Sequence, residues 1–266
     1  MIRYSDGKTF YSDGDSLSYD LGQKVRSGDK EALQKLKNFA ETEDAEQPHS
    51  QARALYEMAE VYFNGFCEVK KSAKNALKFL IQAAELNDDL ALIRLGEFYR
   101  DGKHDFKQDA QKALEYFLKV AELGNQKGYE LAAELYRNGQ GVKPDGCKAI
   151  EFYKKLDELD DKWALMNIAK LYEDGCGKLK PDGYKALEIY DDIIRHGKYW
   201  TEIYRDFDIK SPRLRIYETA LNNTAQIYLF GKAGVKSNKQ KALELYHESA
   251  DLGNPLAKFC LEEITD

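Results

Sequence analysis

Small and apolar residues recur along the chain in one pattern that appears five times. In each copy a Tyr stands three residues before a Gly, small residues stand three and eight positions before the Tyr, and an Ala follows 13 or 14 positions after it. Successive tyrosines are 37, 37, 36 and 56 residues apart. A fixed period of this length is typical of helical repeat arrays. The residues that set the register are Tyr62, Tyr99, Tyr136, Tyr172 and Tyr228, with Gly65, Gly102, Gly139, Gly175 and Gly231.

Each copy predicts two helices, which we call A and B. Offsets of three, four and eight residues place the small and apolar positions on one stripe of each helix. The Gly after the Tyr is expected to end helix A as a left-handed cap. Helix B follows a polar loop such as Lys143-Pro144-Asp145-Gly146 and carries the repeat Ala. The pairs Gly139/Gly141 and Gly175/Gly177 resemble phosphate loops, but no predicted strand precedes them, so we interpret them as helix ends.

Atypical units are expected at both ends of a repeat array because the terminal faces need cover. Ser16 to Arg26 and Asp29 to Thr42 predict a degenerate helix pair, with Ser27 and Asp29 as candidate N-caps. A capping helix is predicted over 255–266, and residues 1–15 predict either a hairpin or an irregular segment. The expected organisation is therefore one solenoid domain over 16–266, with the degenerate pair over 16–50 and five repeats over 53–254.

The fourth copy contains about 20 extra residues near 197–216. Ser211-Pro212 is a typical helix start, which predicts a long helix from Pro212 to Phe230. The rest of the insertion is rich in aromatic residues. It either lengthens helix B and packs on the long helix A, or it forms a projecting aromatic ledge that binds a partner, since Trp and Tyr dominate binding hot spots. The ledge residues are Tyr199, Trp200, Ile203, Tyr204 and Phe207.

Composition narrows the possible functions. The 266 residues are 43% hydrophobic, enough for a sizeable core, and the net charge of -6 argues against a nucleic acid partner. The polar amino terminus lacks the apolar core of a secretory signal, and no stretch approaches about 20 apolar residues, so we expect a cytoplasmic protein without membrane insertion. The four Cys and four His are scattered, which predicts free thiols, no metal site and no cofactor.

The repeated pattern resembles the Sel-one-like repeat family, which is related to tetratricopeptide repeats. The resemblance covers residues 53 to 261. It implies an all-α fold, a right-handed α/α superhelical solenoid, and adaptor or scaffold work that includes toxin-immunity systems. The second copy matches the family pattern best, at Ala91, Leu95, Gly96, Tyr99, Gly102, Asp109, Lys112, Ala113, Tyr116, Phe117, Ala121, Gly124 and Asn125.

One branch of that family is rich in cysteine and carries one disulfide in each repeat. The cysteines of this chain depart from that branch because they occupy unrelated repeat positions: Cys67 and Cys176 in loops, Cys147 before helix B, and Cys260 in the final helix. The secreted, disulfide-bonded form and the β-lactam ligands linked to it are therefore not expected.

By analogy with tetratricopeptide arrays, helix A is expected to line a concave face that holds a protein or peptide. Outward positions lie six and two before the repeat Tyr and one after it. Arg100 and Arg137 are three residues after a Glu and are able to pair with it. The predicted contact residues are Tyr56, Glu60, Phe63, Ile93, Glu97, Arg100, Glu130, Glu134, Arg137, Met166, Lys170, Glu173, Asn222, Gln226 and Leu229, together with Tyr199, Trp200 and Tyr204 of the ledge.

Three functions are compatible with these residues. The favoured one is a non-catalytic scaffold or adaptor. The second is an immunity or inhibitor protein that occludes a specific toxin or enzyme, with the Trp200 segment as a plug. The least favoured is a hydrolase that uses paired carboxylates, because such chemistry requires a closed pocket and no nucleophile with a base and an orienting group is found.

Overall fold

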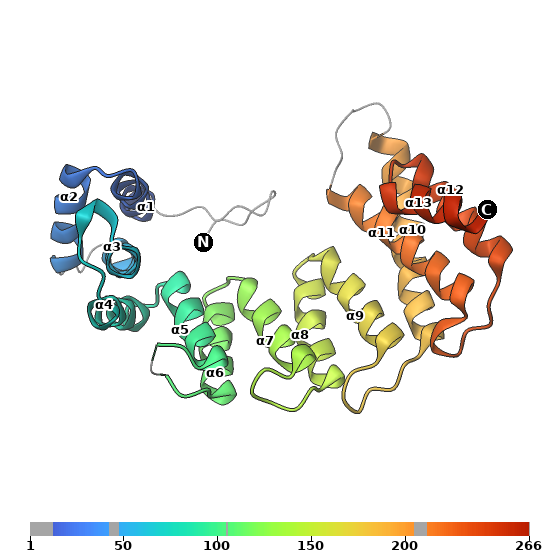
Figure 1. The fold of residues 1–266 in the computed structure, drawn as a ribbon, viewed down its shortest axis with the longest axis horizontal. Helices are drawn as coiled ribbons and strands as arrows, with labels where there is room; N and C mark the ends of the chain where they lie inside the picture. Colours follow the sequence, from blue (N-terminus) through green and yellow to red (C-terminus); the bar gives the residue numbers. More distant parts are fainter. Residues whose placement is uncertain (1–12, 43–47, 105, 205–211, 266) are drawn as a thin grey trace. The chain divides into compact units, whose positions relative to one another are not determined.

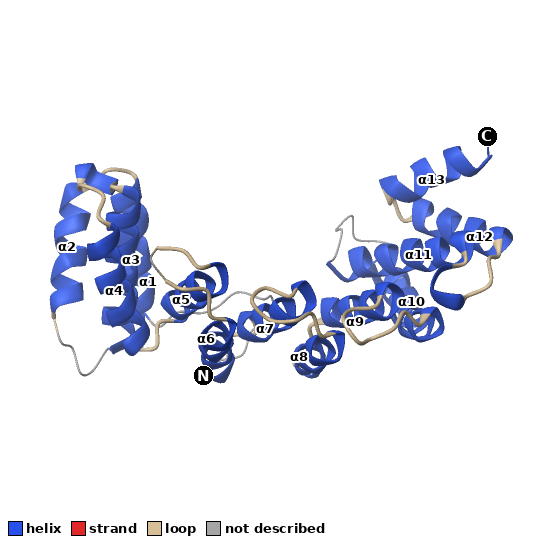
Figure 2. Cartoon of the chain, turned by 60° about the horizontal axis from the view of Figure 1, so that its bottom comes forward, coloured by secondary structure: helices blue, strands red, loops and turns tan. Residues whose placement is uncertain are grey.

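The computed structural model describes residues 13–42, 48–104, 106–204 and 212–265, and in these ranges the chain is built from α-helices joined by loops (Figure 1, Figure 2). The segments 1–12, 43–47 and 205–211, and with them most of the predicted hairpin and part of the ledge, lie outside the described residues. The helices are α1 Asp13–Arg26, α2 Lys30–Glu41, α3 Pro48–Asn64, α4 Ala73–Glu85, α5 Asp89–Asp101, α6 Ala110–Glu122, α7 Lys127–Asn138, α8 Gly146–Glu158, α9 Lys162–Asp174, α10 Gly183–Tyr204, α11 Pro212–Phe230, α12 Lys239–Asp251 and α13 Pro255–Thr265, with short 3-10 helices η1 Phe66–Glu68 and η2 Lys232–Gly234.

The chain divides into two compact units, Met1–Gly128 and Tyr129–Asp266, each with its own apolar core. Unit 1 contains α1 to α6, and unit 2 contains α8 to α13 and nearly all of α7. The expectation of one continuous domain over 16–266 stays a prediction.

The repeat pattern places helix boundaries where the sequence predicts them. Helices α3, α5, α7, α9 and α11 are the A helices, and the glycine that ends each has a positive φ; Gly102, at +66°, donates its amide to the carbonyl of Phe98. Because L-residues rarely adopt this conformation, glycine ends the helix at little cost. The B helices α4, α6, α8, α10 and α12 begin at polar caps. The cap side chains of Ser72, Asp109, Asp145, Asp182 and Asn238 each accept a backbone N–H of the first turn.

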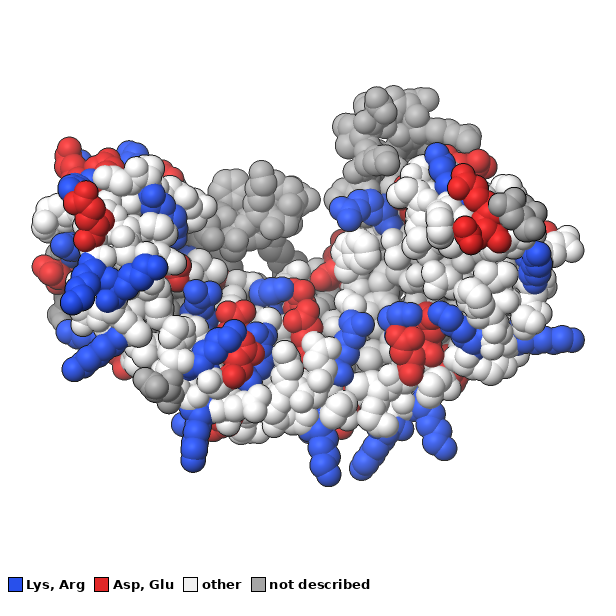
Figure 3. All heavy atoms as spheres, in the orientation of Figure 1, with Lys and Arg blue, Asp and Glu red and all other residues white. Residues whose placement is uncertain are grey.

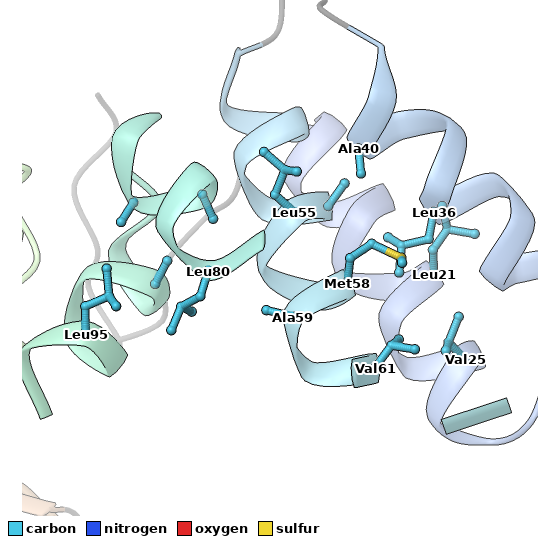
Figure 4. Packing of buried hydrophobic residues seen from close by; sticks show 14 of the residues in the cluster. Leu21, Val25, Leu36, Ala40, Leu55, Met58, Ala59, Val61, Leu80 and Leu95 are labelled. Carbon is cyan, nitrogen blue, oxygen red and sulfur yellow. The ribbon is translucent and has the colours of Figure 1, made fainter. Parts of the chain in front are cut away.

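The amino-terminal helix pair forms part of the core of unit 1. Figure 4 shows Leu21 and Val25 of α1 and Leu36 of α2 directed toward Met58 and Val61 of α3. Complete burial of such side chains contributes roughly 1.5 to 3 kcal/mol each. This packing explains how a degenerate pair covers the first full repeat.

One of the two predicted N-caps of α2 is correct. The side chain of Asp29 accepts the amides of Glu31 and Ala32, both at 2.9 Å, and so caps the helix. The hydroxyl of Ser27 instead donates to the carbonyl of Lys24 at the end of α1. Ser27 therefore closes the preceding helix and does not start the next one.

A lysine lies over the repeat Tyr in the last four copies. It is the residue just before the repeat Ala of helix B, and its Nζ lies 4.3 to 5.3 Å from the centroid of the Tyr ring of helix A. The first copy has Asn75 at this position, and its Tyr62 stacks on Phe79. The cation–π contact links the two helices of a repeat and contributes about 0.5 to 1 kcal/mol at an exposed site. The pairs are Lys112/Tyr99, Lys148/Tyr136, Lys185/Tyr172 and Lys241/Tyr228.

The insertion lengthens helix B of the fourth copy and helix A of the fifth. Helix α10 has 22 residues and α11 has 19, and α11 begins at the predicted Pro212. A Cβ at Gly197 would lie 2.5 Å from the ring of Tyr217, so the missing side chain allows close contact between the two helices. The hydroxyl of Tyr217 donates to Glu248 of α12, which also pairs with Lys198 at 3.3 Å. The lengthened parts of α10 and α11 therefore both contact α12, the next helix B.

In unit 2 the loops that join helix A to helix B pack on one another. The amide of Gly146 donates to the carbonyl of Cys176 at 3.2 Å, and a Cβ at Gly177 would lie only 2.0 Å from the carbonyl oxygen of Pro144. A Cβ at Gly183 would similarly meet the carbonyls of Lys232 and Ala233. Three successive loops therefore form one contiguous edge.

Gly177→Ala is expected to destabilise the protein much more than Gly234→Ala. Both glycines have a left-handed backbone, so each substitution costs about 1 to 3 kcal/mol in strain. Only Gly177 also places the new methyl group against backbone, which adds about 1 to 3 kcal/mol, whereas Gly234 has open space. Urea unfolding of the two variants measures the difference, and equal losses would show that the loops are not in contact.

Candidate partner-binding surface

The predicted contact residues of unit 1 lie on one face of its A helices and are all partly exposed. They are Tyr56, Glu60 and Phe63 on α3, and Ile93, Glu97 and Arg100 on α5. We call these six residues the unit 1 A surface.

In unit 2 the structure separates the predicted residues into two groups. Met166 and Asn222 are buried, with 6% and 4% of their surface exposed, so the expectation that these two point outward is wrong for the observed packing. Met166 belongs to the apolar core that α9 forms with α10 and α11. The partly exposed residues are Glu130, Glu134 and Arg137 on α7, Lys170 on α9, and Gln226 and Leu229 on α11, and we call them the unit 2 A surface.

The arginines of these surfaces have partners other than the glutamate three residues before them. Arg100 pairs with Asp101 at 2.7 Å, and Arg137 donates to the side chain of Asn167 at 3.3 Å. The pairing lowers the pKa of Asp101 to about 2, chiefly through the hydrogen bond from Arg100. Arg100 and Arg137 therefore do not neutralise the negative charges of Glu97 and Glu134.

An aromatic cluster adjoins the unit 1 A surface. The ring centroid of Phe63 lies 5.8 Å from that of Phe98, and the exposed ring of His104 lies 4.6 Å from Phe98 and 5.2 Å from Phe63. Arg94 lies over Phe98 and is 3.7 Å from Glu60. The repeat register could not indicate Arg94 and His104 as parts of this surface, because they reach it from a neighbouring turn and from the loop after α5.

A buried carboxylate lies at the end of α9. The sequence places Glu173 outward, but only 5% of it is exposed. Its oxygens are 3.1 Å from Lys170 Nζ and 3.0 Å from Lys232 Nζ, and the hydroxyl of Tyr190 donates to it at 3.4 Å. Burial and then this carboxylate raise the pKa of Tyr190. The two lysines cover Glu173, which explains why its outward position in the repeat does not make it accessible.

A second buried ionic cluster joins the helices of unit 1. Glu57, only 2% exposed, is 2.6 Å from Arg26 Nη2. Burial raises the pKa of Glu57 to about 7, against the lowering effect of Arg26 and Arg53. Arg53 in turn pairs with Asp88 at 3.0 Å and Asp89 at 2.7 Å. These contacts connect α1, α3 and the start of α5 and have the character of structural ion pairs, since they are closed to a substrate.

The predicted ledge is described only in part. Tyr199 is 62% exposed on the elongated α10. Trp200 and Tyr204 belong to the same helix, but their side chains lie outside the described residues. Within the described ranges no group of three His, Cys, Asp or Glu side chains is placed to hold a metal ion. Nor does any described helix have the length and apolar character needed to cross a membrane.

Five two-helix repeats, each with its glycine-capped helix A, define an all-α repeat solenoid. The chain belongs to the Sel1 repeat family. The family model described as Sel1 repeat matches residues 52–88, 89–125, 129–156, 164–191 and 219–254, which together are more than half of the chain. Sel1 repeats are generally protein–protein interaction modules.

One solved structure supports the fold, and two others are less similar. A Sel1 repeat protein from Oxalobacter formigenes is similar to 96% of this chain over 89% of its own length, with 23% identity and a TM-score of 0.56. Protein c5321, a protective antigen of uropathogenic Escherichia coli with an SLR fold, is 20% identical. The match covers 93% of this chain and 67% of c5321, with a TM-score of 0.45. The immunity protein Pa5087 from Pseudomonas aeruginosa is 21% identical, and the match covers 84% of this chain and 72% of Pa5087. Its TM-score of 0.36 is too low to bear on function. No curated protein is significantly similar to the chain.

The protonation of Glu57 predicts a pH-dependent stability. The folded protein holds this proton up to about pH 7, whereas the unfolded chain releases it near 4.5, so the contribution of Glu57 to the free energy of unfolding falls as pH rises between these values. The fall is on the order of 3 kcal/mol. Urea unfolding from pH 5 to 8 is expected to show a downward slope for the wild type that is reduced in Glu57→Gln. The exposed Glu151→Gln is the control, and a wild-type slope retained in Glu57→Gln would contradict the assignment.

Proposed function

We propose that the chain is a non-catalytic scaffold or adaptor that binds a protein or peptide partner on its A surfaces. The observation that carries the proposal is the unit 1 A surface, where partly exposed aromatic, aliphatic and carboxylate side chains lie on adjacent helices. Such a mixture suits a protein contact, because apolar groups supply buried area while charges supply orientation. Membership of a family of interaction modules supports the same conclusion.

The chemistry of the A surfaces favours basic side chains on the partner. Glu97 and Glu134 are partly exposed and occupy the same position of successive repeats. Phe63 and His104 lie near the unit 1 glutamates and offer aromatic faces, on which a Lys or Arg of the partner can also rest. A segment with alternating basic and apolar residues would therefore match the unit 1 A surface.

Catalysis by paired carboxylates is the least supported function. The buried Glu57 and Glu173 are each paired with basic side chains, and general acid–base chemistry instead requires two carboxyl groups that face a substrate pocket with separated pKa values. The raised pKa of Glu57 arises from its burial, at a position that a substrate does not reach.

An immunity or inhibitor function is the second candidate. It is favoured by Tyr199, a large aromatic side chain left 62% exposed on a helix that the insertion has lengthened. A projecting aromatic residue is an effective plug for a partner's cavity. A single enzyme that co-purifies in equal amount and is released by Tyr199→Ser would support this function over the scaffold.

Charge reversal on the A surfaces is expected to weaken partner binding. Glu97→Lys and Glu134→Lys each place a cation opposite the partner's basic groups, which should raise the dissociation constant about tenfold or more. The measurement is affinity purification of the tagged chain from its native cells, followed by titration of the recovered partner. Glu151→Lys and Glu188→Lys, exposed on B helices, are matched controls. Equal recovery with all four variants and unchanged helicity would refute the proposal.

A further inference from the structure

The loops between helix A and helix B share a lysine that the repeat pattern above does not include. Six residues before every repeat Ala stands a Lys, and all five are exposed. None of them has an ion-pair partner among the described side chains. They are Lys70, Lys107, Lys143, Lys180 and Lys236. A long, strongly hydrated cation that recurs without a partner is not required by the packing of the repeat.

In unit 2 these lysines belong to a larger basic surface. The ranges 139–149, 174–186 and 230–242, which we call the lysine edge, contain nine Lys and three Asp, in a protein whose net charge is -6. Asp145 and Asp182 are occupied in capping helix B, and Asp174 pairs with Lys170. Lys232 pairs with Glu173 and Lys185 lies 3.8 Å from Asp182, so seven of the nine lysines have no ion-pair partner among the described side chains. Figure 3 shows Lys and Arg side chains along the lower margin of the view, where the loops after α7 and α9 lie in Figure 1.

The opposite edge of unit 2 is acidic. Two of the three turns that lead from helix B to the next helix A, 157–162 and 248–254, contain six acidic residues and one Lys, and the third lies outside the described residues. Charge is thus segregated between the two ends of the helices. Because the Debye length is about 8 to 10 Å at physiological salt, an anionic surface at the lysine edge feels mainly the nearby lysines and little of the distant acidic turns.

The lysine edge is also pre-organised. Its three loops pack on one another through the glycine contacts at Gly177 and Gly183, and three further lysines lie over the repeat tyrosines at 4.3 to 5.3 Å. Lys241 Nζ in addition donates to the hydroxyl of Tyr228 at 2.8 Å. These contacts hold the cations at one edge before any ligand binds, which reduces the entropy lost on binding.

Two exposed aromatic side chains share this edge. Tyr184, the second residue of α10, is 63% exposed, and Phe230, the last residue of α11, is 66% exposed with Lys232 Nζ 6.0 Å from its ring. All nine basic residues of the edge are Lys and none is Arg. Arg predominates where phosphate or carboxylate groups are recognised bidentately, whereas Lys with interfacial aromatic residues suits a diffuse anionic surface.

We propose that the lysine edge of unit 2 docks peripherally on a membrane surface that carries anionic lipids. The lysines lie at the level of the lipid headgroups, and Tyr184 and Phe230 enter the interfacial region. Contact is electrostatic, so it is reversible and weakened by salt. The A surfaces are not part of this contact, so the protein partner and the membrane occupy different surfaces.

Vesicle flotation with the full chain tests the proposal. Vesicles of phosphatidylcholine alone are compared with vesicles that contain 30% phosphatidylserine, at about 0.05 M and 0.5 M salt. We expect binding only to the anionic vesicles at low salt. The triple variant Lys143→Glu, Lys180→Glu and Lys236→Glu should lower the partition coefficient about tenfold or more. Tyr184→Ser should lower it by a smaller factor.

A matched triple variant has the same change in net charge away from the edge: Lys154→Glu, Arg195→Glu and Lys258→Glu, all exposed in unit 2. It should retain most of the binding, and circular dichroism checks that both variants stay helical. Equal losses in the two triple variants, or no binding to anionic vesicles at low salt, would overturn the proposal. So would edge-dependent binding to polyglutamate or to single-stranded RNA without binding to vesicles, because either result assigns the edge to another macromolecule. Recovery of the protein partner is measured separately and tests the A surfaces. The triple variant of the lysine edge should recover the partner as the wild type does.

Discussion

Helix A and helix B of each repeat meet through small side chains, and each repeat then leaves an apolar face for the next one to cover. The repeat alanines Ala76, Ala113, Ala149, Ala186 and Ala242 are fully buried. A larger side chain there would separate the helices, and a missing neighbour would expose the remaining apolar face. Stability in such an array is a sum of repeat and nearest-neighbour terms. The irregular helices meet this requirement on either side of the five repeats, since α1 and α2 pack on α3 and α13 packs on α12.

Packing between repeats occupies the inner stripes, so the remaining surfaces are free to differ in chemistry. The exposed face of the A helices mixes Phe63 and Ile93 with glutamates, and in unit 2 the A-to-B loops are rich in lysine while the turns 157–162 and 248–254 are rich in acid. A net charge of -6 conceals this division, since opposite charges at the two ends of the helices nearly cancel. The net charge argues against a nucleic acid partner, but it does not describe the local charge at any one edge of the protein.

The fold was largely predictable from the sequence because it depends on local and periodic signals. Tyr and Gly positions predict the ends of the A helices, polar caps predict the starts of the B helices, and Ser211-Pro212 predicts the start of α11. The contact surface was less predictable. Repeat phase gives the direction in which a side chain leaves its helix, but it does not indicate what covers it. Glu173 leaves its helix outward and is buried because Lys170 and Lys232 fold over it.

The difference between the direction of a side chain and what covers it also explains the buried ion pairs. In an isolated helix Glu57 would be one more solvated carboxylate, and only the close approach of α1, where Gly22 has no side chain, brings it into contact with Arg26. Below about pH 7 Glu57 is protonated and accepts a hydrogen bond from Arg26, and above it the two groups form an ion pair, in which loss of one member would leave a buried charge without compensation. The pair forms only when α1 packs on α3. It therefore couples the ionisation of Glu57 to the docking of the amino-terminal helix pair on the first full repeat.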